Sequence, residues 1–300
     1  MRHEPVLRAE TVRLLELSSG SRVIDATVGD GGHSEAILRA TAPTGRILAL
    51  DADPESLLRA ERFLYDDRER VMFVRSNFTH LEDVAREHQF VDVDAVLMDL
   101  GWSMPQFKER GRGFSFERDE PLDMRYDPTG IVDSAATILA TSSVREIEHM
   151  LRSYGEEPLY REIAQALVEY RDTNAVDTSA KLSEIVLNVY RLKLKTDRAV
   201  PWIGGIHPAT RTFQALRIAV NREFDVLKNV LPQALRVLRS GGRVAVITFH
   251  SLEDRIVKQF FVRNSAYGSI VTKKPCIASD EECARNPAAR SAKLRVFQKK

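Results

Sequence analysis

The 300-residue sequence predicts an α/β fold: a mostly parallel sheet, wrapped by helices and interrupted after its fourth strand by a mostly α-helical inserted domain. Two observations predict this fold. Short apolar runs bounded by turn residues alternate with helical periodicity through the first hundred residues, which is typical of successive strand–helix units in a parallel sheet. The alternation then stops, and a clear strand pattern returns only near residue 242.

Four strands are expected in the first part of the chain. Their sequences are RVIDATV, RILALD, VMFVRS and VDAVLMDL, at residues 22–28, 46–51, 71–76 and 93–100. Two of the intervening helices have recognisable starts. Asp53 precedes Pro54, and Thr79 stands three residues before Glu82, the spacing of a capping box.

The insertion is expected at residues 108–206, which begin as a loop rich in Gly, Arg, Phe and Asp and continue as helices. About a hundred residues suffice for a small domain. A following helix is expected to stop at Gly241 and Gly242, before a strand (GRVAVITF), a helix capped by Ser251 and a closing strand near LRVFQ. Two domains are therefore predicted. A discontinuous catalytic domain comprises 1–107 and 207–300, and an inserted domain for substrate recognition comprises 108–206.

Composition narrows the class of protein. Lys and Arg total 44 against 43 for Asp and Glu, so a polyanion partner would have to meet a local basic patch. Cys276 and Cys283 are too few for a disulfide framework and lack histidines at zinc-ligand spacing, so free thiols and no metal are expected. No run has the length of a membrane span or the form of a signal peptide, which predicts a soluble cytoplasmic protein without a membrane partner.

A glycine-rich loop follows the first predicted strand in the sequence VIDATVGDGGHS. Glycines let the backbone approach a ligand, and the N-terminus of the next helix is electropositive, which is typical of nucleotide-type sites. Ser34 stands where a nicotinamide dinucleotide loop has its third glycine. The spacing of Gly29 and Gly31 fits an S-adenosylmethionine loop better, with Thr27 in the first glycine position.

Three further residues are candidates for the same cofactor site. Asp51 ends the second strand, where these folds place an acid that accepts hydrogen bonds from ribose hydroxyls. Phe78 after the third strand could cover an adenine face or belong to the core. His33 could bind the cofactor or cap the helix that begins there.

Asp99 ends the fourth strand in VLMDLGWSMPQ and should point to the same edge of the sheet as Asp51. Amino-methyltransferases commonly carry Asp/Asn-Pro-Pro-Tyr/Phe at this place, and Asp99, Leu100, Gly101 and Trp102 occupy its four positions here. Our hypothesis is that the Asp99 carboxylate and the Leu100 carbonyl hold the amine of a base while Trp102 stacks on it. The alternative for Trp102 is a half-buried ring that supports the loop.

Taken together, these stretches resemble the bacterial small-subunit ribosomal RNA cytosine-N4 methyltransferases, the MraW or RsmH family. The likeness covers essentially the whole chain, with HEPVL, DATVGDGGHS, DLGWSMPQ, RGFSF, PLDMR, YGEE, TRTFQALRIAVNRE, GGRVAVITFHSLEDRIVK and NPAARSAKLR in order. The chain departs from the family pattern at Trp102, Met104, Glu120 and 158–160, which concerns the shape of the target pocket more than the reaction.

The resemblance implies a Rossmann-like class I fold, S-adenosylmethionine as methyl donor, and methylation of the N4 amine of a cytosine in the decoding region of 16S rRNA, on the small subunit. It implies a cofactor site made by Gly31, Gly32, His33, Asp51, Phe78, Asp99 and Gln106.

Candidates for rRNA contact combine basic and aromatic side chains, which together suit unpaired nucleotides. After the proposed catalytic strand these are Lys108, Arg110, Arg112, Phe114 and Phe116. The chain from Arg285 onward holds six basic residues and no acid, and the insertion adds Lys181, Arg191, Lys193, Lys195 and Arg198. Later candidates are Arg211, Arg217, Asn221 and His250.

Three other functions compete with rRNA methylation. An amino-methyltransferase of DNA or free nucleotides would not explain the matches in the insertion and the tail. A ribosome assembly factor that has lost catalysis would not need Asp51 and Asp99. A nicotinamide dehydrogenase lacks its third glycine. The sequence leaves the oligomeric state open, a homodimer included.

Overall fold

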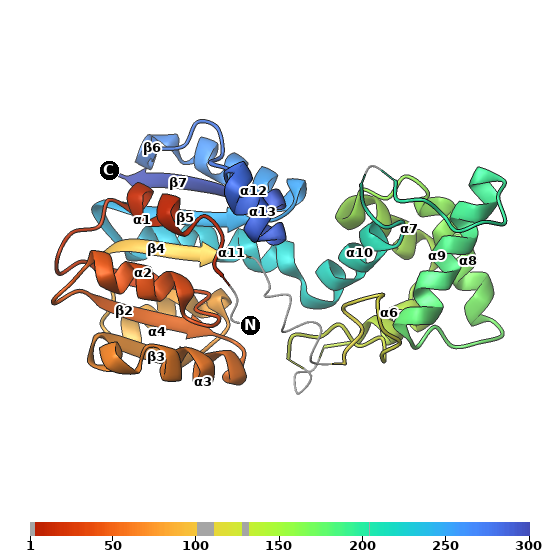
Figure 1. Ribbon diagram of the computed structural model, residues 1–300, viewed down its shortest axis with the longest axis horizontal. Helices are drawn as coiled ribbons and strands as arrows, with labels where there is room; N and C mark the ends of the chain where they lie inside the picture. Colours follow the sequence, from red (N-terminus) through yellow and green to blue (C-terminus); the bar gives the residue numbers. More distant parts are fainter. Residues whose placement is uncertain (1–3, 101–110, 128–131, 204) are drawn as a thin grey trace. The chain divides into compact units, whose positions relative to one another are not determined.

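The structure of the protein is a computed structural model that describes residues 4–100, 111–127, 132–203 and 205–300. The chain divides into two compact units, labelled by element in Figure 1. The first unit comprises Met1–Ser103 with Phe224–Lys300, and the second comprises Met104–Glu223.

The first unit is built on a seven-stranded sheet in the order β3-β2-β1-β4-β5-β7-β6 (Figure 1). Strands β1 to β5 pair in parallel, and β7 runs antiparallel to both β5 and β6. The predicted α/β fold is therefore confirmed, and LRVFQ lies in the predicted closing strand. The strands are β1 (Arg22–Asp25), β2 (Arg46–Asp51), β3 (Val71–Arg75), β4 (Val93–Asp99), β5 (Leu238–Thr248), β6 (Gly268–Ile270) and β7 (Lys293–Lys299).

Alternate residues of the central strands bury their side chains on opposite faces of the sheet, as strand geometry requires. In β4, Val96 and Met98 belong to one buried cluster, and Ala95 and Leu97 belong to the other. Helices α4 (Leu81–Glu87), α11 (Glu223–Val237) and α12 (Ser251–Arg263) contribute to the first cluster. The second cluster is covered by α1 (Arg8–Leu15), α2 (Gly32–Ala40) and α3 (Pro54–Phe63), and the short α13 (Asp280–Arg285) lies near the C-terminus.

The second unit is helical in the part of the chain that is described. Its helices are α6 (Ala135–Thr141), α7 (Val144–Gly155), α8 (Tyr160–Arg171), α9 (Ser179–Leu194) and α10 (Thr210–Asn221), and they enclose a hydrophobic cluster of their own. The second unit runs to Glu223, beyond the predicted boundary at 206. The physical reason is that α10 packs tightly on α7: a Cβ at Gly155 would lie 2.5 Å from the Arg211 carbonyl oxygen.

Several predicted element boundaries differ from the structure, among them the end of the first strand, which is Asp25 and not Val28. The N-cap of α12 is His250, not Ser251, and its Nδ1 accepts from the backbone N–H of Glu253 (3.4 Å). Thr79 makes no capping box, because a turn of 3₁₀ helix at Phe78–His80 precedes α4. Helix α11 ends at Val237, and β5 already begins at Leu238.

Both cysteines are free thiols, as predicted. Among the described residues, no helix combines the length and the apolar character that a membrane span needs.

Candidate active site

The glycine loop joins the end of β1 to the start of α2, at the edge where the parallel strands end. Gly31 is the N-cap of α2 and has a φ of 83°, a left-handed conformation that favours glycine. Gly32 is required by close packing, since a Cβ there would lie 2.8 Å from Cγ of Pro5. The loop is therefore fixed on one side by the N-terminal segment.

Asp51 at the end of β2 holds the same loop from the other side. Its Oδ2 accepts a hydrogen bond from the backbone N–H of Gly29 (3.0 Å), and its Oδ1 accepts one from that of Asp53 (2.9 Å). Burial raises the pKa of the Asp51 carboxyl to about 6, with the two backbone hydrogen bonds acting in the opposite direction. Each oxygen can accept a further hydrogen bond.

Thr27 ties the ends of β1 and β4 together. Its hydroxyl oxygen accepts a hydrogen bond from the backbone N–H of Asp99 (2.7 Å), and its own N–H donates to Asp25 (3.2 Å). The fully buried Asp25 also accepts from the Ser34 hydroxyl (2.6 Å), and burial raises its pKa. Sequence reasoning treated Thr27 only as a departure from a glycine pattern and missed this role.

Replacing Thr27 by Val should misplace Asp99. Valine has nearly the shape of threonine but no hydroxyl, so the backbone N–H of Asp99 would lose its hydrogen-bond acceptor. We expect a loss of about 1 kcal/mol in the free energy of unfolding and a slower methyl transfer. Thr27→Ser keeps the hydroxyl and is the matched control. Denaturant unfolding and single-turnover rates measure the two effects; equal behaviour of the Val and Ser variants would contradict this role.

His33 lies in the first turn of α2, and its side chain is 7% exposed. The interpretation of His33 as the helix cap is wrong, because Gly31 is the N-cap. The Nε2 of His33 is 3.5 Å from Oδ2 of Asp99, and neither ring nitrogen makes a hydrogen bond within the described ranges. Buried polar atoms of this kind normally have partners, so His33 is suited to contact a ligand.

The remaining candidates of the first unit stand at the same strand ends. The backbone N–H of Leu100 donates to the Ile247 carbonyl (2.9 Å), and the side chains of Leu100 and Phe78 pack partly against the core. His250 follows β5, with Nε2 3.2 Å from Oε1 of Glu253. Trp102, Gln106, Lys108 and Arg110 lie outside the described residues.

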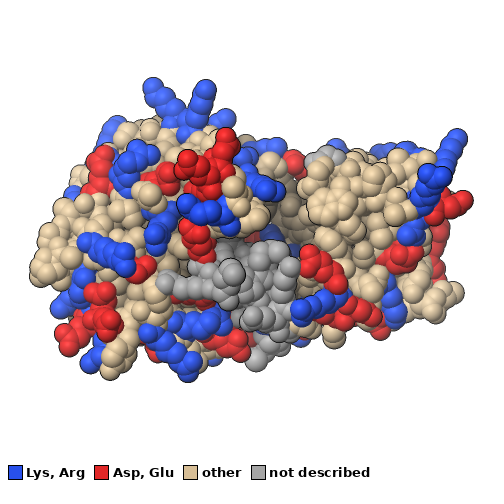
Figure 2. All heavy atoms as spheres, in the orientation of Figure 1, with Lys and Arg blue, Asp and Glu red and all other residues tan. Residues whose placement is uncertain are grey.

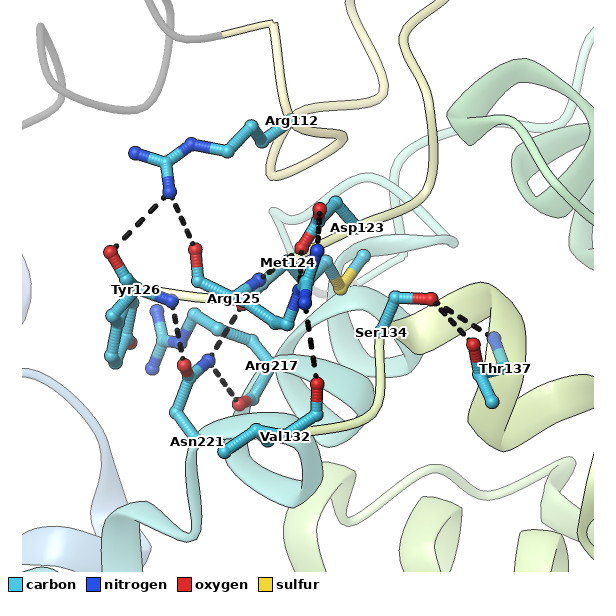
Figure 3. Close-up of polar contacts among 10 residues, drawn as sticks. All are labelled: Arg112, Asp123, Met124, Arg125, Tyr126, Val132, Ser134, Thr137, Arg217 and Asn221. Carbon is cyan, nitrogen blue, oxygen red and sulfur yellow. Dashed lines mark hydrogen bonds and ion pairs between the residues drawn. The ribbon is translucent and has the colours of Figure 1, made fainter. Parts of the chain in front are cut away.

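In the second unit, the RGFSF, PLDMR and NRE segments meet in one polar network (Figure 3). The Asn221 amide donates to the Met124 carbonyl (2.8 Å) and accepts from the Tyr126 N–H (2.9 Å). Arg112 donates to the carbonyls of Arg125 (2.9 Å) and Tyr126 (3.3 Å). Met124 has a left-handed backbone (φ 58°) inside this network, so these bonds hold a strained turn in place.

Several predicted substrate residues thus make contacts within the second unit. Arg217 forms a double hydrogen bond with Glu223 (2.8 and 3.1 Å), and Arg211 donates to the Glu156 carbonyl (2.9 Å). The ring of Phe114 stacks on Tyr126, with centroids 5.8 Å apart. These contacts give the residues a scaffolding role besides any contact with substrate.

The basic C-terminus is also engaged within the fold. Arg295 is buried and pairs with Asp254 through two hydrogen bonds (2.5 and 2.9 Å), and Lys299 donates to the Leu238 carbonyl (2.5 Å). On the face of the first unit seen in Figure 2, Lys and Arg side chains lie among Asp and Glu rather than in one large patch.

A mostly parallel sheet with a glycine loop after β1 and acids at the ends of β2 and β4 is the arrangement of a Rossmann-like enzyme that binds a nucleotide-type cofactor beyond the carboxyl ends of its strands. The model of the MraW methylase family matches residues 1–300, and the chain belongs to that family. The chain is similar to the ribosomal RNA small subunit methyltransferases H of Thermomicrobium roseum (43% identity; 99% of this chain, 93% of the relative) and Symbiobacterium thermophilum (44%; 99% and 96%). A third relative, from Heliobacterium modesticaldum, is 42% identical over 99% of this chain and 98% of its own length.

The protein is thus a methyltransferase, and its methyl donor is S-adenosylmethionine. The site fits this cofactor. His33 offers two buried ring nitrogens that have no partner in the described part of the chain, and Asp51 offers carboxylate oxygens at the position expected for ribose hydroxyls.

Proposed function

We propose that the protein methylates the exocyclic N4 amine of a cytosine in the decoding region of 16S rRNA, on the small ribosomal subunit. The observation that carries the proposal is Asp99, a carboxylate at the end of β4 that is fixed by Thr27 and stands beside His33. The names of the relatives supply the substrate class, since they are called methyltransferases of small-subunit ribosomal RNA. Such a substrate would place the reaction in the cytoplasm.

The cofactor site follows from the same residues. Gly31, Gly32 and His33 at the start of α2, with Asp51 and Phe78, would hold S-adenosylmethionine together with Gln106, which lies outside the described residues. When bound, this cofactor supplies an electrophilic methyl group on a sulfonium sulfur.

The amine of cytosine is a weak nucleophile because its lone pair is delocalised into the ring. Asp99 would accept a hydrogen bond from the amine, and the Leu100 carbonyl would accept a second, so that the lone pair is directed at the methyl group. After transfer the amine nitrogen is positively charged and strongly acidic, and its proton passes to the Asp99 carboxylate. Trp102 would stack on the base.

The second unit, including the insertion predicted at 108–206, would bind the ribosomal substrate. Reversing the charge of Lys195 and Arg198 together should raise the KM for small subunits about tenfold, since each lost phosphate contact removes counterion-release energy. The affinity for S-adenosylhomocysteine should stay within twofold. A change in cofactor affinity with an unaltered KM would contradict this division of labour.

The substrate class is tested by the transfer of a labelled methyl group from S-adenosylmethionine. The acceptors are small subunits from cells that lack the modification, large subunits, duplex DNA and free cytidine nucleotides. We expect label in 16S rRNA alone. Label in DNA or in nucleotides would support the competing amino-methyltransferase function, and no label despite cofactor binding would support an assembly factor without catalysis.

A further inference from the structure

Phe116 is one of the aromatic residues that the sequence indicates as candidates for stacking on an unpaired base. One face of its ring is covered: His207 stacks on it with centroids 4.2 Å apart and an interplanar angle of 14°. The buried Phe213 meets it edge to face at 5.5 Å. Burial lowers the pKa of His207, which favours the neutral ring in this stack. Phe116 is therefore an inner member of an aromatic series.

The series continues outward to Trp202. Its indole meets His207 edge to face, with centroids 6.4 Å apart and an interplanar angle of 84°. Trp202 is 68% exposed, although large aromatic side chains are usually more buried than this. Its position is fixed by the next residue, since Ile203 and Ile206 exchange two backbone hydrogen bonds (2.9 and 3.3 Å). The series thus runs from the core at Phe213 to an indole displayed in solvent.

Two cationic side chains precede the indole in the chain. Lys195 is the C-cap of α9, and Arg198 lies in the bend that follows; both are exposed, and neither forms an ion pair with any described residue. The neighbouring cations differ, because Arg191 pairs with Glu184 (2.7 Å) and Lys193 with Glu162 (3.6 Å). Arg198 and Trp202 are four positions apart in the chain, so their Cα atoms lie within about 14 Å, a distance comparable with the spacing of a few nucleotides.

We propose that Trp202 is a stacking platform for an unpaired nucleotide of ribosomal RNA, with Lys195 and Arg198 meeting the neighbouring phosphates. The proposal deepens the proposed function and rests on it for the identity of the RNA. An exposed aromatic side chain a few positions along the chain from cations that form no ion pair with any described residue is a combination suited to single strands, since every base has a face that can stack. Duplex RNA does not offer its base faces, so the site selects unpaired segments.

The first experiment uses the fluorescence of the indole itself. The chain has two tryptophans, so Trp202 is the single emitter in a Trp102→Phe background. Titration with a single-stranded oligoribonucleotide should quench this emission in a saturable manner, and the same oligomer annealed to its complement should leave it nearly unchanged. Absence of quenching, or equal quenching by the duplex, would overturn the proposal.

The second experiment separates stacking from a general effect of an exposed apolar residue. Trp202→Ala should weaken binding of the single strand about tenfold and raise the KM for small subunits, while Trp202→Phe should retain most of both. Leu192→Ala is the matched control, because Leu192 is 80% exposed in the same unit. Equal losses in the two alanine variants, or loss of self-association without loss of RNA affinity, would overturn the platform.

The experiments distinguish an error in the role of Trp202 from an error in the proposed function. If the wild type methylates 16S rRNA and Trp202→Ala does so with the same KM, the platform is wrong and the function stands. If the wild type methylates no rRNA but Trp202 is still quenched selectively by single strands, the binding site stands and the substrate must be sought among other single-stranded nucleic acids.

Discussion

Asp99→Ala should reduce the rate of methyl transfer by about 10²- to 10³-fold. The carboxylate is a fixed acceptor, because its backbone N–H is bonded to the Thr27 hydroxyl (2.7 Å) and its Oδ2 lies 3.5 Å from the buried His33. A carboxylate that is already in position need not reorient as positive charge develops on the amine. Its removal should therefore destabilise the transition state more than the bound substrate. Single-turnover rates with saturating cofactor and small subunits measure the effect.

Asp99→Asn is the matched variant. An amide oxygen still accepts one hydrogen bond but cannot take the proton, so the loss should be smaller than in the alanine variant. S-adenosylhomocysteine affinity is the control, since Asp99 is also a candidate cofactor contact. If Asp99→Ala weakens cofactor binding in proportion to the lost rate, the residue holds the cofactor and the amine has another acceptor.

Asp51→Ala should weaken the binding of S-adenosylhomocysteine about 100-fold, because two charge-assisted hydrogen bonds to ribose would be lost. The Gly29 N–H would also lose its acceptor and loosen the loop. Isothermal titration calorimetry measures the change, and the unfolding free energy serves to exclude a general loss of folding. A fall of less than threefold would remove Asp51 from the cofactor site.

The same carboxyl makes this affinity depend on pH. Asp51 has a pKa raised to about 6, and ribose hydroxyls are best accepted by its ionised form. Below that pH, cofactor binding must displace a proton from Asp51. The affinity for S-adenosylhomocysteine should therefore be constant above pH 6 and decrease below it, with a slope that approaches tenfold per pH unit. Asp51→Asn cannot ionise and should bind weakly with no such slope. A wild type whose affinity is constant from pH 5 to 7 would contradict the assignment.

The raised pKa also sets the sign of the effect on folding. The folded protein prefers protonated Asp51, so this group contributes most to stability below its unfolded pKa of about 3.9. That contribution is lost as the pH rises through about 6. Bound ribose hydroxyls would oppose this loss, which is a reason to expect greater stabilisation by cofactor at neutral than at acidic pH.

Much of the fold follows from local sequence patterns. The apolar runs that predict the strands are those that fill both faces of the sheet, and Asp53 with Pro54 starts α3 as predicted. The N-cap at His250 was missed because Ser is the more usual cap and imidazole seldom serves as one. Helix α10 belongs to the second unit because it packs on α7, which is distant in the sequence. No local sequence pattern could therefore reveal that α10 lies in this unit.

The residues of the candidate site were predicted because they stand at strand ends. The hydrogen bonds that hold these residues in place could not be predicted from the sequence. Thr27 binds Asp99 across 72 positions, and Asn221 binds Met124 across 97. Trp202 carried no signal, since an isolated Trp in a sequence says nothing of its exposure. Asp25 lies within the first predicted strand, and only the packing of the folded chain shows that its carboxyl group is fully buried.

Nucleoside mass spectrometry of 16S rRNA tests the central claim most directly. Small subunits from cells lacking the modification are incubated with the protein and S-adenosylmethionine, and the rRNA is digested to nucleosides. We predict a gain of N4-methylcytidine that Asp99→Ala abolishes. A gain of 5-methylcytidine or of a ribose-methylated nucleoside instead would contradict the role of Asp99 as the acceptor of an exocyclic amine.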